Sequence, residues 1–168
     1  LLRVSGFGSG SISNAITAPN GTLTADKIAE DTTVNNTHII FQGYTYTSGI
    51  QYTLSVYAKA AERNYVNVEI GGSGPFGSAT NATFSLVDGS VTASSNSPTT
   101  SAVNVGNGWW RLSVSKVATG SASSNVIFYI ADNTGSRVYT GDGTSGIYLW
   151  GAQLEQSDTV GEYVKTTS

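Results

Sequence analysis

Aromatic and planar polar side chains recur at alternating positions in several short segments of the chain. A sugar ring presents an apolar C–H face and a ring of hydroxyls, so a sugar site combines an aromatic platform with hydrogen-bonding groups. The candidate platforms are Tyr57, Tyr65, Trp109 and Tyr129, and the candidate polar partners are Lys59, Asn67, Glu69 and Arg111. The alternative is that Trp109 packs beneath a loop and that a carboxylate such as Glu69 holds Arg111, so that both residues stabilise the fold.

Oxygen-bearing side chains in the later part of the chain are candidate calcium ligands. Calcium takes six to eight oxygen ligands, and Asp132, Asn133 and Asp142 could supply some of them together with loop carbonyls. Asp26 and Glu155 form a second candidate pair. The competing interpretation is that these aspartates only cap turns.

Residues suited to catalysis are sparse. The chain has no cysteine, and its one histidine, His38, lies in the apolar run HIIFQ, where a packed ring is expected. No Gly-x-Ser-x-Gly elbow before a helix is present. Glycoside hydrolysis needs two carboxylates across one cleft, and no spacing links any two of Glu62, Glu69, Asp88, Asp132 and Asp142. The sequence therefore predicts that the chain is not an enzyme.

Strands with a two-residue hydrophobic period carry the candidate sugar-binding residues. In each of these strands the apolar residues face inward, so the candidate residues face outward. The four strands are Gln51–Lys59, Tyr65–Ile70, Trp109–Val117 and Asn125–Ala131. The link Ala60–Asn64 is short enough for a hairpin between the first two.

The apolar run Ile147–Leu154 predicts a central strand covered on both faces, with Gly151 marking either a bulge or a close approach of another backbone. Other segments predict further strands at Thr22–Ile28 and His38–Gln42, a hairpin around Asp88-Gly89 within Asn81–Thr92, a loop at Ser94–Ser101, a trimmed first strand within Leu1–Ser13, and a short strand or linker at Tyr163–Lys165. Eight or nine strands separated by turns predict an all-β fold, a two-sheet antiparallel β-sandwich.

Composition narrows the class of protein. The 168 residues suit one domain spanning 1–168, and the absence of methionine predicts excision from a longer chain. The net charge of −3, with eight scattered Lys and Arg, predicts no nucleic-acid partner. No apolar run reaches the roughly 18–20 residues of a membrane span, so no membrane partner is expected. Only 11% of residues are charged, which suits an extracellular location or a virion surface.

Three segments resemble a known family. Ala18–Lys27 (APNGTLTADK), Asn107–Ser115 (NGWWRLSVS) and Tyr139–Gln156 (YTGDGTSGIYLWGAQLEQ) look like the opening, middle and last strands of carbohydrate-binding-module-like jelly-roll domains. Such domains occur in phage tail and fibre proteins and in some secreted polysaccharide-acting enzymes. The resemblance covers most of the chain and implies a jelly roll. Related modules hold a structural calcium with a carboxylate on the last strand, where this chain has Trp150 and Gly151.

The resemblance implies a non-catalytic, lectin-like module that recognises a polysaccharide or cell-surface glycan. The alternative is a structural domain of a phage tail, fibre or head-decoration protein without a ligand site. A third possibility is an accessory module of a secreted lyase or hydrolase. The expected partners are a glycan and other copies of the chain within a larger fibre.

Overall fold

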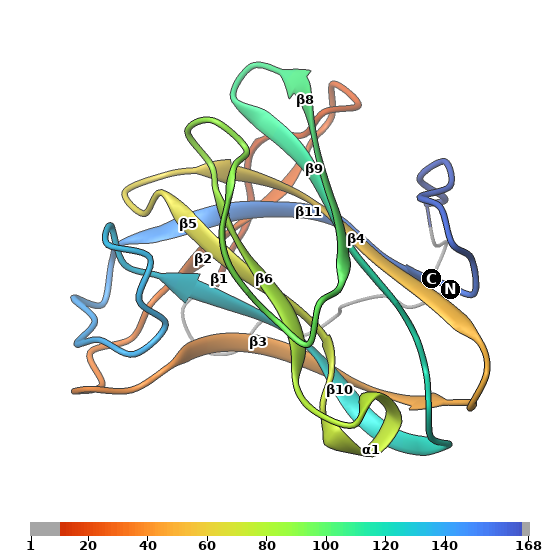
Figure 1. The fold of residues 1–168 in the computed structure, drawn as a ribbon. Helices are drawn as coiled ribbons and strands as arrows, with labels where there is room; N and C mark the ends of the chain where they lie inside the picture. The colour runs from red at the N-terminus through yellow and green to blue at the C-terminus, as the bar shows by residue number, and fades with distance from the viewer. Residues whose placement is uncertain (1–10, 166–168) are drawn as a thin grey trace.

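Residues 11–165 are described by the computed structural model, and they form two antiparallel sheets packed face to face (Figure 1). The six-stranded sheet has the order β1 (Ser11–Thr17), β2 (Leu23–Ala29), β11 (Gly146–Glu155), β4 (Gln51–Ala60), β9 (Trp109–Val117) and β8 (Thr99–Gly106). The five-stranded sheet has the order β3 (His38–Tyr46), β10 (Ala122–Ala131), β5 (Tyr65–Gly71), β6 (Thr80–Ser85) and β7 (Val91–Ser95). The short helix α1 (Ser73–Phe76) links β5 to β6 and contacts β10. The predicted all-β sandwich is confirmed.

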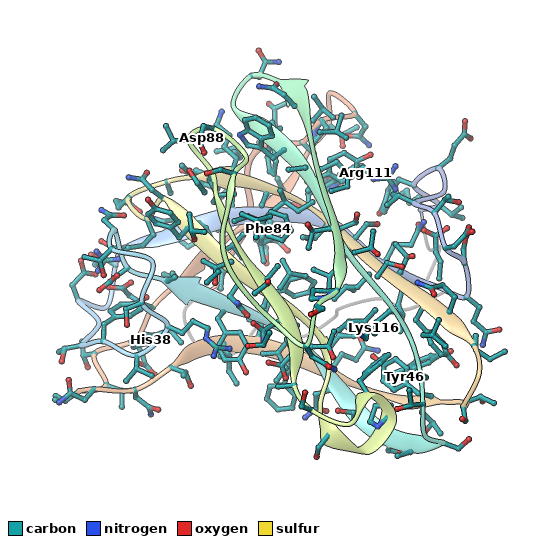
Figure 2. The ribbon with its side chains drawn as sticks, viewed as in Figure 1. His38, Tyr46, Phe84, Asp88, Arg111 and Lys116 are labelled. Atoms are coloured by element: carbon teal, nitrogen blue, oxygen red, sulfur yellow. The ribbon has the colours of Figure 1, made fainter. Side chains whose placement is uncertain are left out.

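The main hydrophobic core lies between the two sheets. Alternate residues of β4, β5, β9 and β10 are buried in it, as their period predicts: Tyr52, Leu54, Val56, Ala58, Val66, Val68, Ile70, Leu112, Val114, Val126, Phe128 and Ile130. Phe84 of β6 belongs to the same core and lies between the layers in Figure 2. The residues between these positions therefore face away from the core, on the outer side of each sheet.

The chain crosses repeatedly between the sheets, which gives the jelly-roll order of the strands. The expected hairpin across Ala60–Asn64 is wrong, because β4 belongs to the six-stranded sheet and β5 to the five-stranded one. Length alone does not distinguish a short hairpin loop from a short crossover. This crossover places the outward residues of β4 and β5 on opposite sides of the molecule.

The central strand β11 pairs with β2 on one side and with β4 on the other. Its register against β4 shifts between Trp150 and Gln153. Gly151 lies in this shift with φ of 61°, and a Cβ there would come within 3.2 Å of the Tyr57 and Tyr163 rings. The predicted bulge is confirmed, and it lets a later part of the chain approach the sheet.

Other elements differ from the sequence prediction. Ser94–Ser101, expected to be a loop, contains the end of β7 and the start of β8. These edge strands are largely exposed, so burial imposes no hydrophobic alternation on them. Of the two alternatives for Tyr163–Lys165, a short strand or a linker, the strand is excluded. The expected strand within Leu1–Ser13 lies mainly outside the described residues. In residues 11–165, no helix is long and apolar enough to cross a membrane.

Candidate functional site

The eight predicted sugar-binding residues are divided between the outer faces of the two sheets. Tyr57 and Lys59 on β4 lie beside Arg111 and Trp109 on β9, in the six-stranded sheet. The other four belong to the five-stranded sheet: Tyr65, Asn67 and Glu69 on β5, and Tyr129 on β10. The fold therefore forms two separate groups of four.

Trp109 is not an exposed platform. Its side chain is 2% exposed and packs in a small second core with Ala18 and Ala25, next to Tyr57 and Trp150. The structure thus corrects the prediction in favour of its alternative, in which Trp109 packs beneath a loop. The physical reason is that Ala18, between β1 and β2, and Ala25 of β2 pack in one cluster with the indole.

The C-terminal segment, residues 156–165, contacts the rest of this face. The Tyr163 ring lies 4.3 Å from that of Trp150, and the Trp150 ring lies 5.2 Å from that of Tyr57. Arg111 lies with its Cζ 5.1 Å from the Tyr57 ring centre and donates through Nη2 to the Gly161 carbonyl at 2.6 Å. Figure 2 shows Arg111 on the side towards this segment.

The same alternative suggested a carboxylate such as Glu69 as the partner of Arg111, and this part of it is wrong. Its partner is the backbone oxygen of Gly161, because Glu69 lies on the other sheet. Tyr57 and Arg111 are therefore engaged by the chain itself. Lys59 is half-buried beside Trp109, to which it is paired across the strands.

The outer face of the five-stranded sheet has a different character. Cross-strand register aligns two rows of outward side chains on this face. One row is Ile39, Tyr129, Asn67, Thr83 and Ala93, and the next is Phe41, Ile127, Glu69, Asn81 and Ser95. The β3–β10 half is apolar apart from the Tyr129 hydroxyl, while the β5–β6 half carries amide, carboxylate and hydroxyl groups. We call these two rows, together with Arg137, the amphipathic face.

Glu69 is at the centre of the hydrogen bonds on the amphipathic face. Its Oε2 accepts from the Tyr129 hydroxyl at 3.3 Å and from Asn81 Nδ2 at 3.4 Å. Arg137 Nη1 lies 3.9 Å from the same oxygen, and the Arg137 Cζ lies 4.9 Å from the Tyr129 ring centre. Asn67 Nδ2 donates to Asn81 Oδ1 at 3.1 Å, which extends the network to a second amide.

Burial is the main influence on the pKa values of Glu69 and Tyr129 in this network. It raises the pKa of Glu69 above its ordinary value, against the opposing effects of the Tyr129 hydroxyl, Arg137 and Asn81. Burial likewise raises the pKa of Tyr129, and the neighbouring Glu69 carboxylate adds to this shift. The charged form of Glu69 is therefore poorly solvated and favours a further hydrogen-bond donor.

One fully buried polar atom on the amphipathic face has no hydrogen-bond partner. Asn67 is 1% exposed, and its Oδ1 accepts no hydrogen bond, although its Nδ2 donates both to Asn81 and to Thr83 Oγ1. Beside this polar group the apolar half is open, since Phe41 is 56% exposed and Ile39 is also exposed. An unsatisfied acceptor beside exposed apolar surface suits an amphipathic ligand.

Several residues of the amphipathic face escaped the sequence analysis. Asn81 lies in a predicted hairpin and Arg137 in a long polar connection, and neither position has a period that marks it as part of a face. Phe41 lies in the apolar run HIIFQ, whose alternation with Ile40 could have identified it as outward. Tyr65, the remaining predicted platform on β5, is half-buried at the margin of the face, next to Gly135.

The predicted calcium ligands hold turns together. Asp132 Oδ1 accepts from the backbone N–H of Thr134 at 2.9 Å and of Ser136 at 3.0 Å. Asp142 accepts from the Ser145 hydroxyl and from backbone N–H groups, and these bonds, led by that hydroxyl, lower its pKa. Asn133 Oδ1 accepts from the backbone of residue 64, and its Nδ2 donates to the carbonyl of residue 62.

The second candidate pair is separated along the sheet. Asp26 on β2 is paired with Leu149, whereas Glu155 lies six residues further along β11, about 20 Å away at the rise of a strand. Within residues 11–165, no three His, Cys, Asp or Glu side chains form a group suited to a metal ion.

A buried ionic network ties the loops at one end of the sandwich and was not anticipated. The side chain of Glu30 is 0% exposed and accepts from Arg63 through both Nε and Nη2. It also accepts from the Tyr139 hydroxyl and from the Asp142 backbone N–H. Burial alone would raise the pKa of Glu30, but the Arg63, Asp142 and Tyr139 hydrogen bonds outweigh it and lower the pKa. The buried Glu30 carboxylate therefore has hydrogen-bond donors for both of its oxygens within this network.

His38 is buried next to this network, as its apolar surroundings predict. Its ring lies 4.6 Å from that of Tyr139, and its Nδ1 lies 3.0 Å from Asp31 Oδ1. Its Nε2 lies 3.4 Å from the Tyr139 carbonyl oxygen. His38 therefore contributes to the packing of the loops around β3, where Figure 2 shows it.

Comparison with known proteins adds no family to this description. No protein-family model matches the chain, and no curated protein matches it.

Proposed function

We propose that the chain is a non-catalytic carbohydrate-binding module whose ligand lies on the amphipathic face. The observation that carries the proposal is the division of this face into an exposed apolar half, with Phe41 and Ile39, and a hydrogen-bonding half, with Asn67, Glu69 and Asn81. A pyranose has the same division between its C–H face and its hydroxyls. The site consists of groups on paired strands, which hold them in fixed positions.

The amphipathic face of the five-stranded sheet suits ligand binding better than the outer face of the six-stranded sheet. On the six-stranded sheet, Trp109 is buried, and the Tyr57 ring lies against Trp150 and Arg111, so side chains of the protein itself already contact this ring. Single-site affinity on the amphipathic face would be modest. Several copies in an extracellular or virion fibre would raise avidity through effective concentration.

A glycan-array screen of the purified domain, with calcium and again with chelator, tests the proposal. Hits are then titrated with Phe41→Ala and Asn67→Ala, which remove an apolar contact and the unpartnered acceptor. Each variant should weaken binding at least about tenfold. Val103→Ala is the matched control, since Val103 is 54% exposed on β8 of the other sheet. A folded protein that binds no glycan, or variants that bind like the control, would overturn the proposal.

A structural role in a phage tail, fibre or head decoration is the second candidate. The observation that favours it is the outer edge of the six-stranded sheet, where β8 carries exposed Val103 and Val105 and no charged residue. An uncharged edge strand is a template for pairing with another chain. Sedimentation at high protein concentration tests this role. A persistent oligomer that Val103→Lys dissociates supports it, and a monomer at all concentrations refutes it.

A further inference from the structure

We propose that the amphipathic face selects neutral, hydroxyl-rich glycans over the corresponding uronic-acid glycans, with Glu69 and Arg137 as the residues that determine this selectivity. The inference rests on the proposed function and adds a ligand class to it. Three features of the site carry it: its unmet acceptors, its internal charge balance and the burial of Glu69.

The unmet hydrogen-bonding capacity near Glu69 is acceptor capacity. Asn67 Oδ1 is buried without a partner. The Tyr129 hydroxyl, Asn81 and Arg137 all approach Oε2 of Glu69, so none of these three groups engages Oε1. A sugar hydroxyl can donate to such oxygens. An ionised carboxylate on a ligand carries only acceptors, so it cannot satisfy either atom.

The charges at the site are already balanced. Arg137 lies 3.9 Å from Glu69 and over the Tyr129 ring, so its guanidinium offsets the buried carboxylate. A uronate that recruited Arg137 would leave Glu69 buried without its cation, which is strongly unfavourable. A uronate that left the pair intact would place a second anion near a poorly solvated first one. Both arrangements weaken the binding of the acidic ligand. A neutral glycan neither separates Arg137 from Glu69 nor places a second anion beside Glu69.

Matched oligosaccharides test the inference. A neutral hexose oligomer that binds the domain is compared by calorimetric titration with the same oligomer oxidised to uronate at C6. In the wild type, the neutral oligomer should bind at least about tenfold more tightly, the usual cost of an unmet polar contact. Uronate binding that equals or exceeds neutral binding would overturn the inference and leave the carbohydrate-binding function standing. Failure of both oligomers to bind would overturn both.

Two variants should shift the ratio in opposite directions. Glu69→Gln releases Arg137 for the uronate, so the preference for the neutral oligomer should fall about tenfold or more. Arg137→Ala leaves Glu69 unopposed, so the preference should increase even if total affinity falls. Glu162→Gln removes the same charge from an exposed residue of the C-terminal segment and should leave the ratio unchanged. Melting curves establish that each variant is folded. Equal ratios in the wild type and both site variants would refute the assignment to Glu69 and Arg137.

Discussion

Arg63→Ala should destabilise the fold by about 3–5 kcal/mol, because it leaves a buried carboxylate without its cation. Glu30 is fully buried and takes two of its four hydrogen bonds from Arg63. Arg63 also lies with its Cζ 5.3 Å from the Tyr139 ring centre, so the substitution removes a packing contact as well. For a chain of this size, each kcal/mol lowers Tm by about 2–4 °C, which gives a fall of roughly 6–20 °C.

Urea unfolding followed by circular dichroism at pH 7 measures this loss. The matched control is Lys27→Ala, which removes the 2.9 Å ion pair between Lys27 and Glu62, whose carboxylate is exposed. An ion pair with an exposed partner contributes about 0–1 kcal/mol. If the two variants lost the same free energy of unfolding, the reasoning that burial makes the Glu30–Arg63 pair indispensable would be refuted.

The same variant has a pH signature. The lowered pKa of Glu30 contributes stability that is present above the unfolded value of about 4.3 and is lost as pH falls through the folded pKa. Without Arg63, burial favours the protonated form of Glu30. Acidification should therefore reduce the destabilisation of the variant. The difference in free energy of unfolding between wild type and Arg63→Ala should therefore be smaller at pH 3.5 than at pH 7. A constant difference would contradict this account.

Three further predictions concern other parts of the molecule. Trp109→Ala should lower stability by about 3–5 kcal/mol in urea unfolding, without changing glycan affinity in the folded fraction, because the indole is buried outside the amphipathic face. Since burial raises the pKa of Glu69, the contribution of this residue to stability should fall as pH rises from about 4.3 through its folded pKa. Glu69→Gln should therefore gain stability relative to the wild type between pH 4 and pH 7, as measured by unfolding curves. Addition of calcium or chelator should leave Tm unchanged, because Asp132 and Asp142 already accept hydrogen bonds within their own turns, and a calcium-dependent rise in Tm would refute this.

The inward faces of the strands were predictable because they depend on a local signal. Burial of one face imposes a period of two, and the residues that it identified on β4 and β5, such as Leu54 and Val68, are fully buried. The sequence analysis missed the edge strand β8 because β8 lacks this signal. Its side chains are mainly exposed, so no burial constrains their order.

Pairings between distant segments were not predictable from one sequence. Arg63 lies 33 residues from Glu30, and Tyr139 lies 109 residues from it. A buried ionic network requires only that these groups meet in space, and it leaves no periodic pattern in the chain. The crossover at Ala60–Asn64 likewise depends on which sheet each strand joins, which its length does not encode.

The sequence also could not predict which of the two outer sheet faces is the better candidate for a ligand site. Tyr57 and Tyr129 occupy equivalent outward positions on alternating strands, and both are half-buried. Their surroundings differ because the C-terminal segment packs on the six-stranded sheet and brings Tyr163 close to Tyr57. Tyr129 instead has Glu69 and Arg137 as neighbours. The surroundings of an outward aromatic residue therefore depend on segments that are distant in the sequence, and the period of its own strand does not encode them.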